Sequence, residues 1–334
     1  LHFPGVPIVQ LCHGWVPWEE RPLKHPSIVK YLAVDDPSYD RLIVEEGIVP
    51  DRVEILRNFV DLSRFGARGP LPERPRRALV FSNGASPDGY ATVIREACAR
   101  TGIQVEIGGL RCGRPIASPE SILRDFDLVF AKARSALEAL AVGCGVILAD
   151  AAGCGPLVTT REFDRLRAWN FGIRALQHPH SVEWYARQLA AFDAADAASV
   201  SARVRAEAGL DAAVERLLAV YEGVVQSASA EPARRSPEAA QRAAARHLAW
   251  LAREFKTAQH ARERLAASCD EQCARANAAE AALASQQLRL ATLEQEVQAY
   301  RSLSTIRLRD RVLRVPFVGG AVRRAARALT ASRD

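Results

Sequence analysis

Two basic side chains and two glycines lie close together in the middle of the sequence, where they could bind a phosphate group. The stretch from Asp127 to Thr160 has the pattern of a strand, a turn with Lys132 and Arg134, a helix, a second strand and a Gly-rich loop. Open α/β sheets bind ligands at the carboxyl ends of their strands, where helix N-termini attract anions. Arg grips a phosphate through two parallel hydrogen bonds, and Gly153 and Gly155 would let the backbone approach closely. The sequence therefore predicts an anion site here.

The elements that must position this site follow an α/β pattern. From residue 7 to about residue 225, short β-branched runs alternate with amphipathic stretches, as in doubly wound parallel sheets. Seven runs are predicted to form strands: Pro7–Cys12, Tyr31–Val34, Val53–Leu56, Ala78–Ser82, Gln104–Ile107, Leu128–Phe130 and Val146–Leu148. Helix starts are predicted at the Ser-Pro pairs 86–87 and 118–119, and at a capping box of Ser135 with Glu138.

Shifts in composition divide the chain into segments. Residues 66–75 contain two Gly, three Pro and two Arg, which is typical of a linker. The predicted segments are a partial Rossmann-like domain at 1–65, a linker at 66–77, a second Rossmann-like domain at 78–225, a linker at 226–237, a coiled-coil helix at 238–303 and a basic amphipathic tail at 304–334. The first domain is short, because a complete Rossmann-like half needs on the order of 100 residues.

A heptad repeat runs through residues 238–303, which contain no Gly and no Pro. One series of positions is Leu248, Phe255, Arg262, Cys269, Ala276, Leu283, Leu290 and Val297. The other is Leu251, Ala258, Leu265, Gln272, Ala279, Gln286, Leu293 and Tyr300. Thirteen of these sixteen residues are apolar, which predicts a coiled coil and self-association. A helix folded back on the globular part is the alternative.

The tail carries the basic charge of the chain. Residues 301–334 contain nine Arg and two Asp, a net charge of +7, against +6 for the whole sequence. Arg alternates with Leu, Val and Phe around a break at 316–320, so the tail is predicted to contact an anionic membrane surface. A solvated tail or an RNA contact is the alternative. The rest of the chain has no basic excess, which argues against a nucleic-acid-binding globular domain.

The seven cysteines show no metal-binding pattern. They are scattered, and no C-x-x-C pair or zinc spacing with His is present, so they are interpreted as reduced thiols of a cytoplasmic protein with no structural metal. The longest uncharged apolar stretch, Ala139–Ala149, is shorter than the roughly 20 residues of a membrane span. The sequence begins at Leu1 and contains no Met, which leaves open whether residues precede it.

The segment ALEALAVGCGVIL, between the basic turn and the Gly-rich loop, resembles the donor-binding motif of family 4 (group 1) glycosyltransferases. That motif has an acidic residue, seven others, then Glu and a small-residue turn, and its second acidic position falls on Glu138. The resemblance implies that this carboxylate accepts hydrogen bonds from the ribose hydroxyls of a nucleotide sugar. The first acidic position falls on Phe130.

Two upstream segments resemble the same family. Residues 57–65 are similar to its N-x-V-D-x-x-x-F interdomain connection, and residues 11–15 to the segment that brings a histidine to the donor sugar. The resemblance makes His13 the candidate catalytic residue and adds Gly14, Asn83 and Ser135 to the donor-binding residues. The family's Gly-Arg element after the first strand of the second domain is replaced by residues Ser82 to Gly84.

The resemblance implies two Rossmann-like domains of the glycosyltransferase B type and the transfer of a sugar from a nucleotide-diphosphate donor. The acceptor would be a cell-surface glycan or a lipid-linked molecule. The family retains the anomeric configuration, and basic groups can stabilise the leaving diphosphate without a metal or cofactor. We expect a cytoplasmic enzyme, peripheral on the inner face of a membrane if the tail binds lipid.

Two other functions remain open. A noncatalytic protein could bind a nucleotide sugar, or nothing, while its coiled coil assembles other proteins; the missing acidic residue and the short first domain favour this alternative. A nucleotide-sugar epimerase would use the same two-domain fold and turn over the donor without an acceptor.

Overall fold

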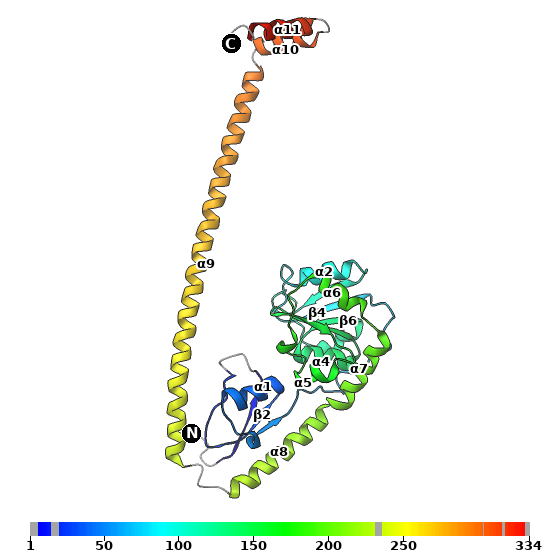
Figure 1. Ribbon diagram of the computed structural model, residues 1–334, viewed down its shortest axis with the longest axis vertical. Coiled ribbons are helices and arrows are strands. Elements are labelled where there is room, and N and C mark those ends of the chain that lie inside the picture. Colours follow the sequence, from blue (N-terminus) through cyan, green and yellow to red (C-terminus); the bar gives the residue numbers. More distant parts are fainter. Residues whose placement is uncertain (1–5, 15–19, 231–235, 303, 316–317, 331–334) are drawn as a thin grey trace. The chain divides into compact units, whose positions relative to one another are not determined.

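The computed structural model describes residues 6–14, 20–230, 236–302, 304–315 and 318–330. The chain divides into two compact units, Leu1–Leu251 and Ala252–Asp334. The first unit contains two β-sheets with their helices, and the second is entirely helical in its described part. Figure 1 shows both units.

The smaller sheet of the first unit has three parallel strands in the order β1-β2-β3. They are β1 (Ile8–Cys12), β2 (Ile28–Ala33) and β3 (Val53–Ile55). Helix α1 (Asp36–Asp40) follows β2 and continues as a π-helical turn, Arg41–Glu45. The Oδ1 atom of Asp35 accepts a hydrogen bond from the Ser38 N–H (2.8 Å), so this carboxylate caps the helix.

The larger sheet has five strands in the order β5-β4-β6-β7-β8. Four are parallel: β4 (Arg77–Phe81), β5 (Gln104–Gly108), β6 (Leu128–Ala131) and β7 (Gly145–Asp150). The edge strand β8 (Gly153–Leu157) is antiparallel to β7. All seven predicted strands are therefore confirmed, and β8 is an eighth that the sequence analysis missed.

Helices cover both faces of the larger sheet (Figure 1). Side chains of α2 (Ala91–Ala99) and α6 (Val182–Ala190) belong to one hydrophobic core, and those of α4 (Ala133–Val142), α5 (Phe163–Ala168) and α7 (Ala194–Glu207) to the other. Short helical turns lie at Pro50–Arg52, Leu123–Asp125 and Ile173–Ala175, and helix α3 at Pro119–Ile122. These two apolar layers fix the strands whose carboxyl ends carry the site.

Two of the predicted helix starts are wrong. Residues 86–89 form a turn, and α2 begins only at Ala91. Helix α4 begins at Ala133, so Ser135 lies inside the helix and cannot cap it. The predicted helix start at residues 118–119 is confirmed, because α3 begins at Pro119 with Ser118 at the capping position.

The chain crosses between the two sheets at two places that are hydrogen-bonded to each other. The Val60 N–H donates to the Ala208 carbonyl (2.8 Å), and the Leu210 N–H donates to the Val60 carbonyl (3.0 Å). Helix α8 (Leu210–Ala230) starts at this crossing and contacts β1 and β2. Helix α8 thus packs against the smaller sheet, although it follows the larger sheet in the chain.

The second unit consists of helices in its described part. Helix α9 (Pro237–Ser302) begins in the first unit and is continuous over 66 residues, about 100 Å at 1.5 Å per residue. It is followed by α10 (Ser304–Arg314) and α11 (Val318–Thr330), which pack against each other. The α/β class with parallel sheets and a long C-terminal helix is as predicted. No helix in the described ranges has the length and apolarity needed to cross a bilayer.

Candidate functional site

The predicted lysine and an unpredicted aspartate meet at the carboxyl ends of neighbouring strands. Lys132 directly follows β6, Asp150 ends β7, and the Lys132 Nζ atom lies 3.3 Å from Asp150 Oδ1. The Ser82 hydroxyl, just after β4, donates to Asp150 Oδ2 (3.0 Å). The Asp150 carboxylate therefore connects the ends of β4, β6 and β7. It also forms an ion pair with the Lys132 ammonium and balances its charge.

A half-buried histidine contacts the backbone of the aspartate. His180 Nε2 lies 2.9 Å from the Asp150 backbone carbonyl, and Nδ1 lies 2.7 Å from the Tyr185 hydroxyl. Because a carbonyl only accepts, Nε2 carries the proton and Nδ1 accepts from Tyr185. The His180 ring also stacks on Tyr90 (centroids 4.8 Å apart). Burial lowers the pKa of His180, which agrees with a neutral imidazole.

Glu138 is buried on α4, with only 7% of its surface exposed. Its Oε1 atom accepts a hydrogen bond from Arg134 Nε (2.9 Å), one helical turn earlier. Burial raises the pKa of this carboxyl, and Arg134 opposes the shift. The Arg134 side chain is otherwise exposed, so the structure brings the two residues together as an ion pair on α4.

The start of α4 has an unusual backbone. Ala133 has a φ of +49°, and Asn170 and Phe171 have φ values of +55° and +52°. The Ala133 N–H donates to the Phe171 carbonyl (2.8 Å), so these three non-glycine residues with positive φ meet at one point. The first amide of α4, that of Ala133, therefore already has an acceptor. The amides of Arg134 and Ser135 follow it in the first turn, where helix geometry provides no intrahelical acceptor.

The predicted Gly-rich loop is a strand. Gly153 and Gly155 are buried in β8. A Cβ atom at Gly153 would lie 2.9 Å from the His178 carbonyl oxygen, and one at Gly155 would lie 2.5 Å from that of Ala175. The missing side chains of these glycines therefore leave room for the backbone of residues 175–178. The two glycines are in close contact with protein backbone and do not line an open ligand site.

The remaining predicted residues lie at the ends of β1 and β4. Asn83 is exposed in the turn after β4, next to Ser82. His13 is exposed after β1, and the Gly14 carbonyl accepts a hydrogen bond from Arg41 Nη1 (2.8 Å). His13, Gly14 and Asn83 therefore lie just after strand ends, and the structure shows no direct bond from His13 to Lys132 or Glu138 within the described ranges.

The turn at Asn170–Gly172 lies between the two sheets. On one side Phe171 bonds to Ala133 after β6; on the other, a Cβ atom at Gly172 would lie 4.0 Å from Asp35 Oδ2, just after β2. The ion pair of Arg174 with Asp40 (3.1 Å) makes a second link. The carboxyl ends of β2 and β6 thus face the same turn, although the sequence analysis singled out neither Asp35 nor this turn.

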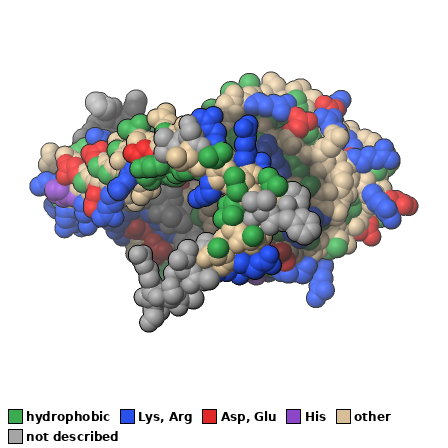
Figure 2. Space-filling view, turned by 90° about the horizontal axis from the view of Figure 1, so that it is seen from above, with side chains coloured by type: hydrophobic (Ala, Val, Ile, Leu, Met, Phe, Trp, Pro, Cys, Tyr) green, Lys and Arg blue, Asp and Glu red, His purple; other side chains and the backbone are tan. Residues whose placement is uncertain are grey.

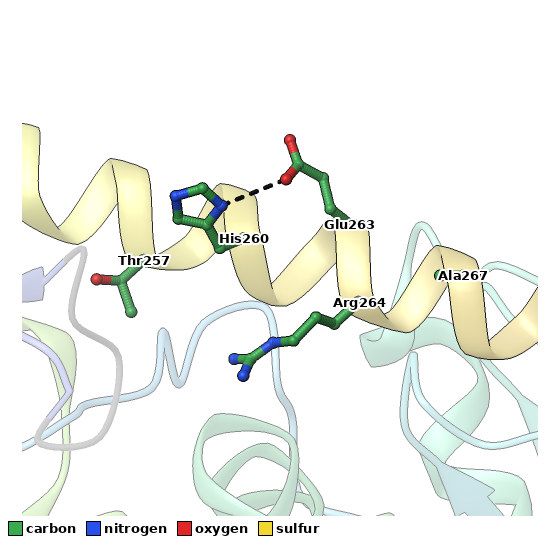
Figure 3. Close-up of a pocket in the computed structure, with 5 residues that line it drawn as sticks. All are labelled: Thr257, His260, Glu263, Arg264 and Ala267. Carbon is green, nitrogen blue, oxygen red and sulfur yellow. Dashed lines mark hydrogen bonds and ion pairs between the residues drawn. The ribbon is translucent and has the colours of Figure 1, made fainter.

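Among the described residues, no group of three or more His, Cys, Asp or Glu side chains could hold a metal ion. Figure 2 shows Lys and Arg side chains spread among acidic and apolar ones. The hollow lined by Thr257, His260, Glu263, Arg264 and Ala267 is formed by a single helix, with His260 and Glu263 paired at 3.3 Å on its outside (Figure 3).

Comparison with known proteins gives structural likeness only. No family model matches the sequence, and no curated protein matches it. A glycosyltransferase from Rickettsia africae ESF-5 is 12% identical, with a TM-score of 0.40 over 59% of this chain and 63% of its own. A point mutant of TarM from S. aureus, in complex with fondaparinux, α-GlcNAc-glycerol and UDP, is 14% identical, with a TM-score of 0.39 over 58% of this chain and 44% of its own.

This chain spans less than two thirds of either structure. Both TM-scores are below 0.5.

Proposed function

We propose that the protein transfers a sugar from a nucleotide-diphosphate donor to a glycan or lipid-linked acceptor, as a glycosyltransferase of the B-type fold that resembles family 4. The observation that carries the proposal is the placement of a cation directly before helix α4 and of a buried carboxylate within that helix. Lys132 precedes α4 at the end of β6, and Glu138 is buried further along the same helix.

The donor diphosphate would bind at the start of α4. The Lys132 ammonium, the Arg134 guanidinium and the amides of the first turn would surround its oxygens, and the helix dipole would add to the attraction. Charge builds on the leaving diphosphate as the glycosidic bond breaks, and these groups would stabilise it without a metal or further cofactor. In this proposal Asn83 and Ser135 are additional hydrogen-bonding groups for the donor.

Glu138 would hold the ribose. Arg134 engages Oε1, and Oε2 would accept the hydrogen bonds of the ribose hydroxyls. The carboxyl must be ionised to accept both, and the neighbouring Arg134 favours that form against the effect of burial. His13 and Gly14, at the end of β1, would contact the sugar from the smaller sheet. The family resemblance implies retention of the anomeric configuration.

Calorimetric titration of the full chain with UDP- and GDP-sugars tests the donor site. Glu138→Ala should lower donor affinity about tenfold or more, because a charged hydrogen-bond acceptor is lost in a buried place. Glu96→Ala is the matched control, since Glu96 forms the same kind of pair with Arg100 (2.9 Å) but on the exposed surface of α2. Equal affinities of the Glu138 variant and the control would reject the site.

A noncatalytic binding or scaffold protein is the second candidate. It is favoured by two observations: Asp150 already pairs with Lys132, and the first acidic position of the family motif is Phe130, which is fully buried in β6. Absence of binding to any nucleotide sugar in the same titrations would support the scaffold over the enzyme. Binding without sugar transfer to lipid-linked acceptors would support a noncatalytic binder.

We also propose that α10 and α11 contact an anionic membrane surface. The described residues of these two helices include Arg307, Arg309, Arg311 and Arg314 on α10 and Arg323, Arg324 and Arg327 on α11. Exposed Leu308 and Val322 lie among them, so each helix offers apolar side chains beside cations. This combination suits the boundary between lipid headgroups and acyl chains.

A further inference from the structure

Helix α9 exposes a row of large apolar side chains. Leu265, Leu283 and Leu290 have exposed fractions of 72%, 56% and 59%, and Leu293, Val297 and Tyr300 are also exposed. A long helix with this much exposed apolar surface gains its stability by packing its apolar stripe against another element. These residues all lie on the two core series of the heptad repeat, so the stripe has the period of a coiled-coil seam.

We propose that the partner of this stripe is a second copy of the same chain, and that the two α9 helices form a parallel, in-register, two-stranded coiled coil. In heptad letters, Leu283, Leu290 and Val297 take position a, and Leu293 and Tyr300 take position d. The proposal is independent of the proposed enzymatic function.

The charges beside the seam fix the direction and register. In a parallel in-register pair, each g residue faces the e residue five places later on the other helix. The charged g residues in the second half of α9 are Arg275, Arg289 and Glu296, and they face Glu280, Glu294 and Arg301 of the second copy, respectively. All three contacts are attractive, and the twofold symmetry makes each of them twice.

The other e and g positions add no like-charge contact. In the first half of the seam Glu254 faces Gln259, Ala261 faces Ala266, and Ser268 faces Cys273; further along, Ala282 faces Gln287. The charged contacts of this arrangement are therefore all attractive. Within a single chain Arg275 pairs with Glu271 of its own helix (2.5 Å), on the exposed surface, so it is available to contact Glu280 of the second copy at little cost.

A polar core position favours two strands. Arg262 is at position a, where its long side chain can extend out of a two-stranded seam to water, and polar residues at a are known to set oligomer state. Cys269 is also at position a, so the two copies of this thiol would face each other across the seam. Cys273 is at position e, at its edge. Both cysteines are exposed in the single chain.

The arrangement has a consequence for the tail. Because α10 and α11 follow α9 directly in the chain, a parallel pair carries both Arg-rich tails at the same end of the coil. Two linked tails bind a surface more tightly than either alone, since the second binds at a high effective concentration.

Sedimentation of the full reduced chain tests the association. We expect a mass of twice 36.5 kDa. Arg289→Glu should weaken the dimer about tenfold, because two attractive contacts become repulsive, and adding Glu294→Arg should restore it. Arg264→Glu, on the outer surface of the helix at position c, is the control with the same charge change. A monomer, a trimer, or failure of the double variant to restore the dimer would overturn the proposal.

Disulfide crosslinking tests the direction. Mild oxidation should give a covalent dimer that Cys269→Ser abolishes and Cys273→Ser preserves. Tyr300→Cys, placed in a chain in which Cys269 and Cys273 are replaced by Ser, should restore the crosslink near the far end of the helix. Crosslinking through Cys269 but not through position 300 would indicate antiparallel helices and overturn the proposal.

Discussion

The Lys132 ammonium lies 3.3 Å from the Asp150 carboxylate, and the two residues end neighbouring parallel strands of the larger sheet. In the proposed enzyme the same ammonium must bind a diphosphate. The carboxylate would hold Lys132 in place before the donor arrives, but its negative charge would also repel the donor.

Removing that charge should strengthen donor binding. Asp150→Asn keeps the shape of the side chain and an oxygen for the Ser82 hydroxyl, while it leaves the Lys132 charge unopposed. We expect the affinity for a nucleoside diphosphate to rise roughly threefold to tenfold at low salt, and less at high salt. Calorimetry measures it, with Asp164→Asn, an exposed aspartate paired with Arg203, as the control. Unchanged or weaker binding would show that Lys132 does not contact the diphosphate.

His180 should make the stability of the first unit depend on pH. Its folded pKa is lowered by burial, so the unfolded chain takes up the proton first as the pH falls. Stability is then fully present above the ordinary histidine pKa near 6.5 and decreases as the pH falls toward the folded pKa. Urea unfolding between pH 8 and pH 5 should show this loss, and His180→Gln should remove part of it.

The control for this experiment is His260→Gln, because His260 is exposed on α9. The same slope in the wild-type protein and in His180→Gln would contradict the assignment of a neutral, half-buried imidazole. Comparing slopes rather than absolute stabilities separates the titration from the lost stacking on Tyr90.

The sequence predicted those parts of the fold that depend on local pattern. The seven β-branched runs are strands because their apolar side chains fill the hydrophobic cores of the two sheets. Lys132 was found because it directly follows one of these runs. Asp150 follows another, so a search for charged residues at the ends of adjacent strands would have found it.

Tertiary contacts decided the parts that the sequence missed. The Ser135–Glu138 capping pattern is overridden because the Phe171 carbonyl accepts from the Ala133 amide, and the helix starts earlier. Strand β8 has the sequence GCGPL, with weak strand propensity. It forms because its glycines leave room for the 175–178 backbone.

Replacement of a glycine by alanine should have opposite effects on stability at a crowded and at an open position. Gly155→Ala should destabilise the first unit by roughly 1–3 kcal/mol, since the new methyl group would overlap the Ala175 carbonyl in a buried strand. Gly223→Ala should stabilise it by about 0.5–1 kcal/mol, since Gly223 lies within α8 with open space around it. Chemical denaturation measures both. A neutral Gly155 variant would mean that the 175–178 segment moves aside easily.

The tail should bind anionic membranes through its arginines. Arg311 is exposed on α10, and a cation near an anionic surface contributes about 1 kcal/mol, or roughly a fivefold change in affinity. Arg311→Gln should therefore weaken binding of the full chain to vesicles containing phosphatidylserine by about that factor, whereas Arg264→Gln on α9 should have no effect. Removal of residues 304–334 should abolish the binding, and the wild-type binding should decrease as salt increases.

Because the apolar side chains Leu308 and Val322 contribute independently of charge, Leu308→Ser should weaken binding at high salt as well. Equal vesicle binding by the full and shortened chains would assign the membrane contact to another part of the protein or exclude it.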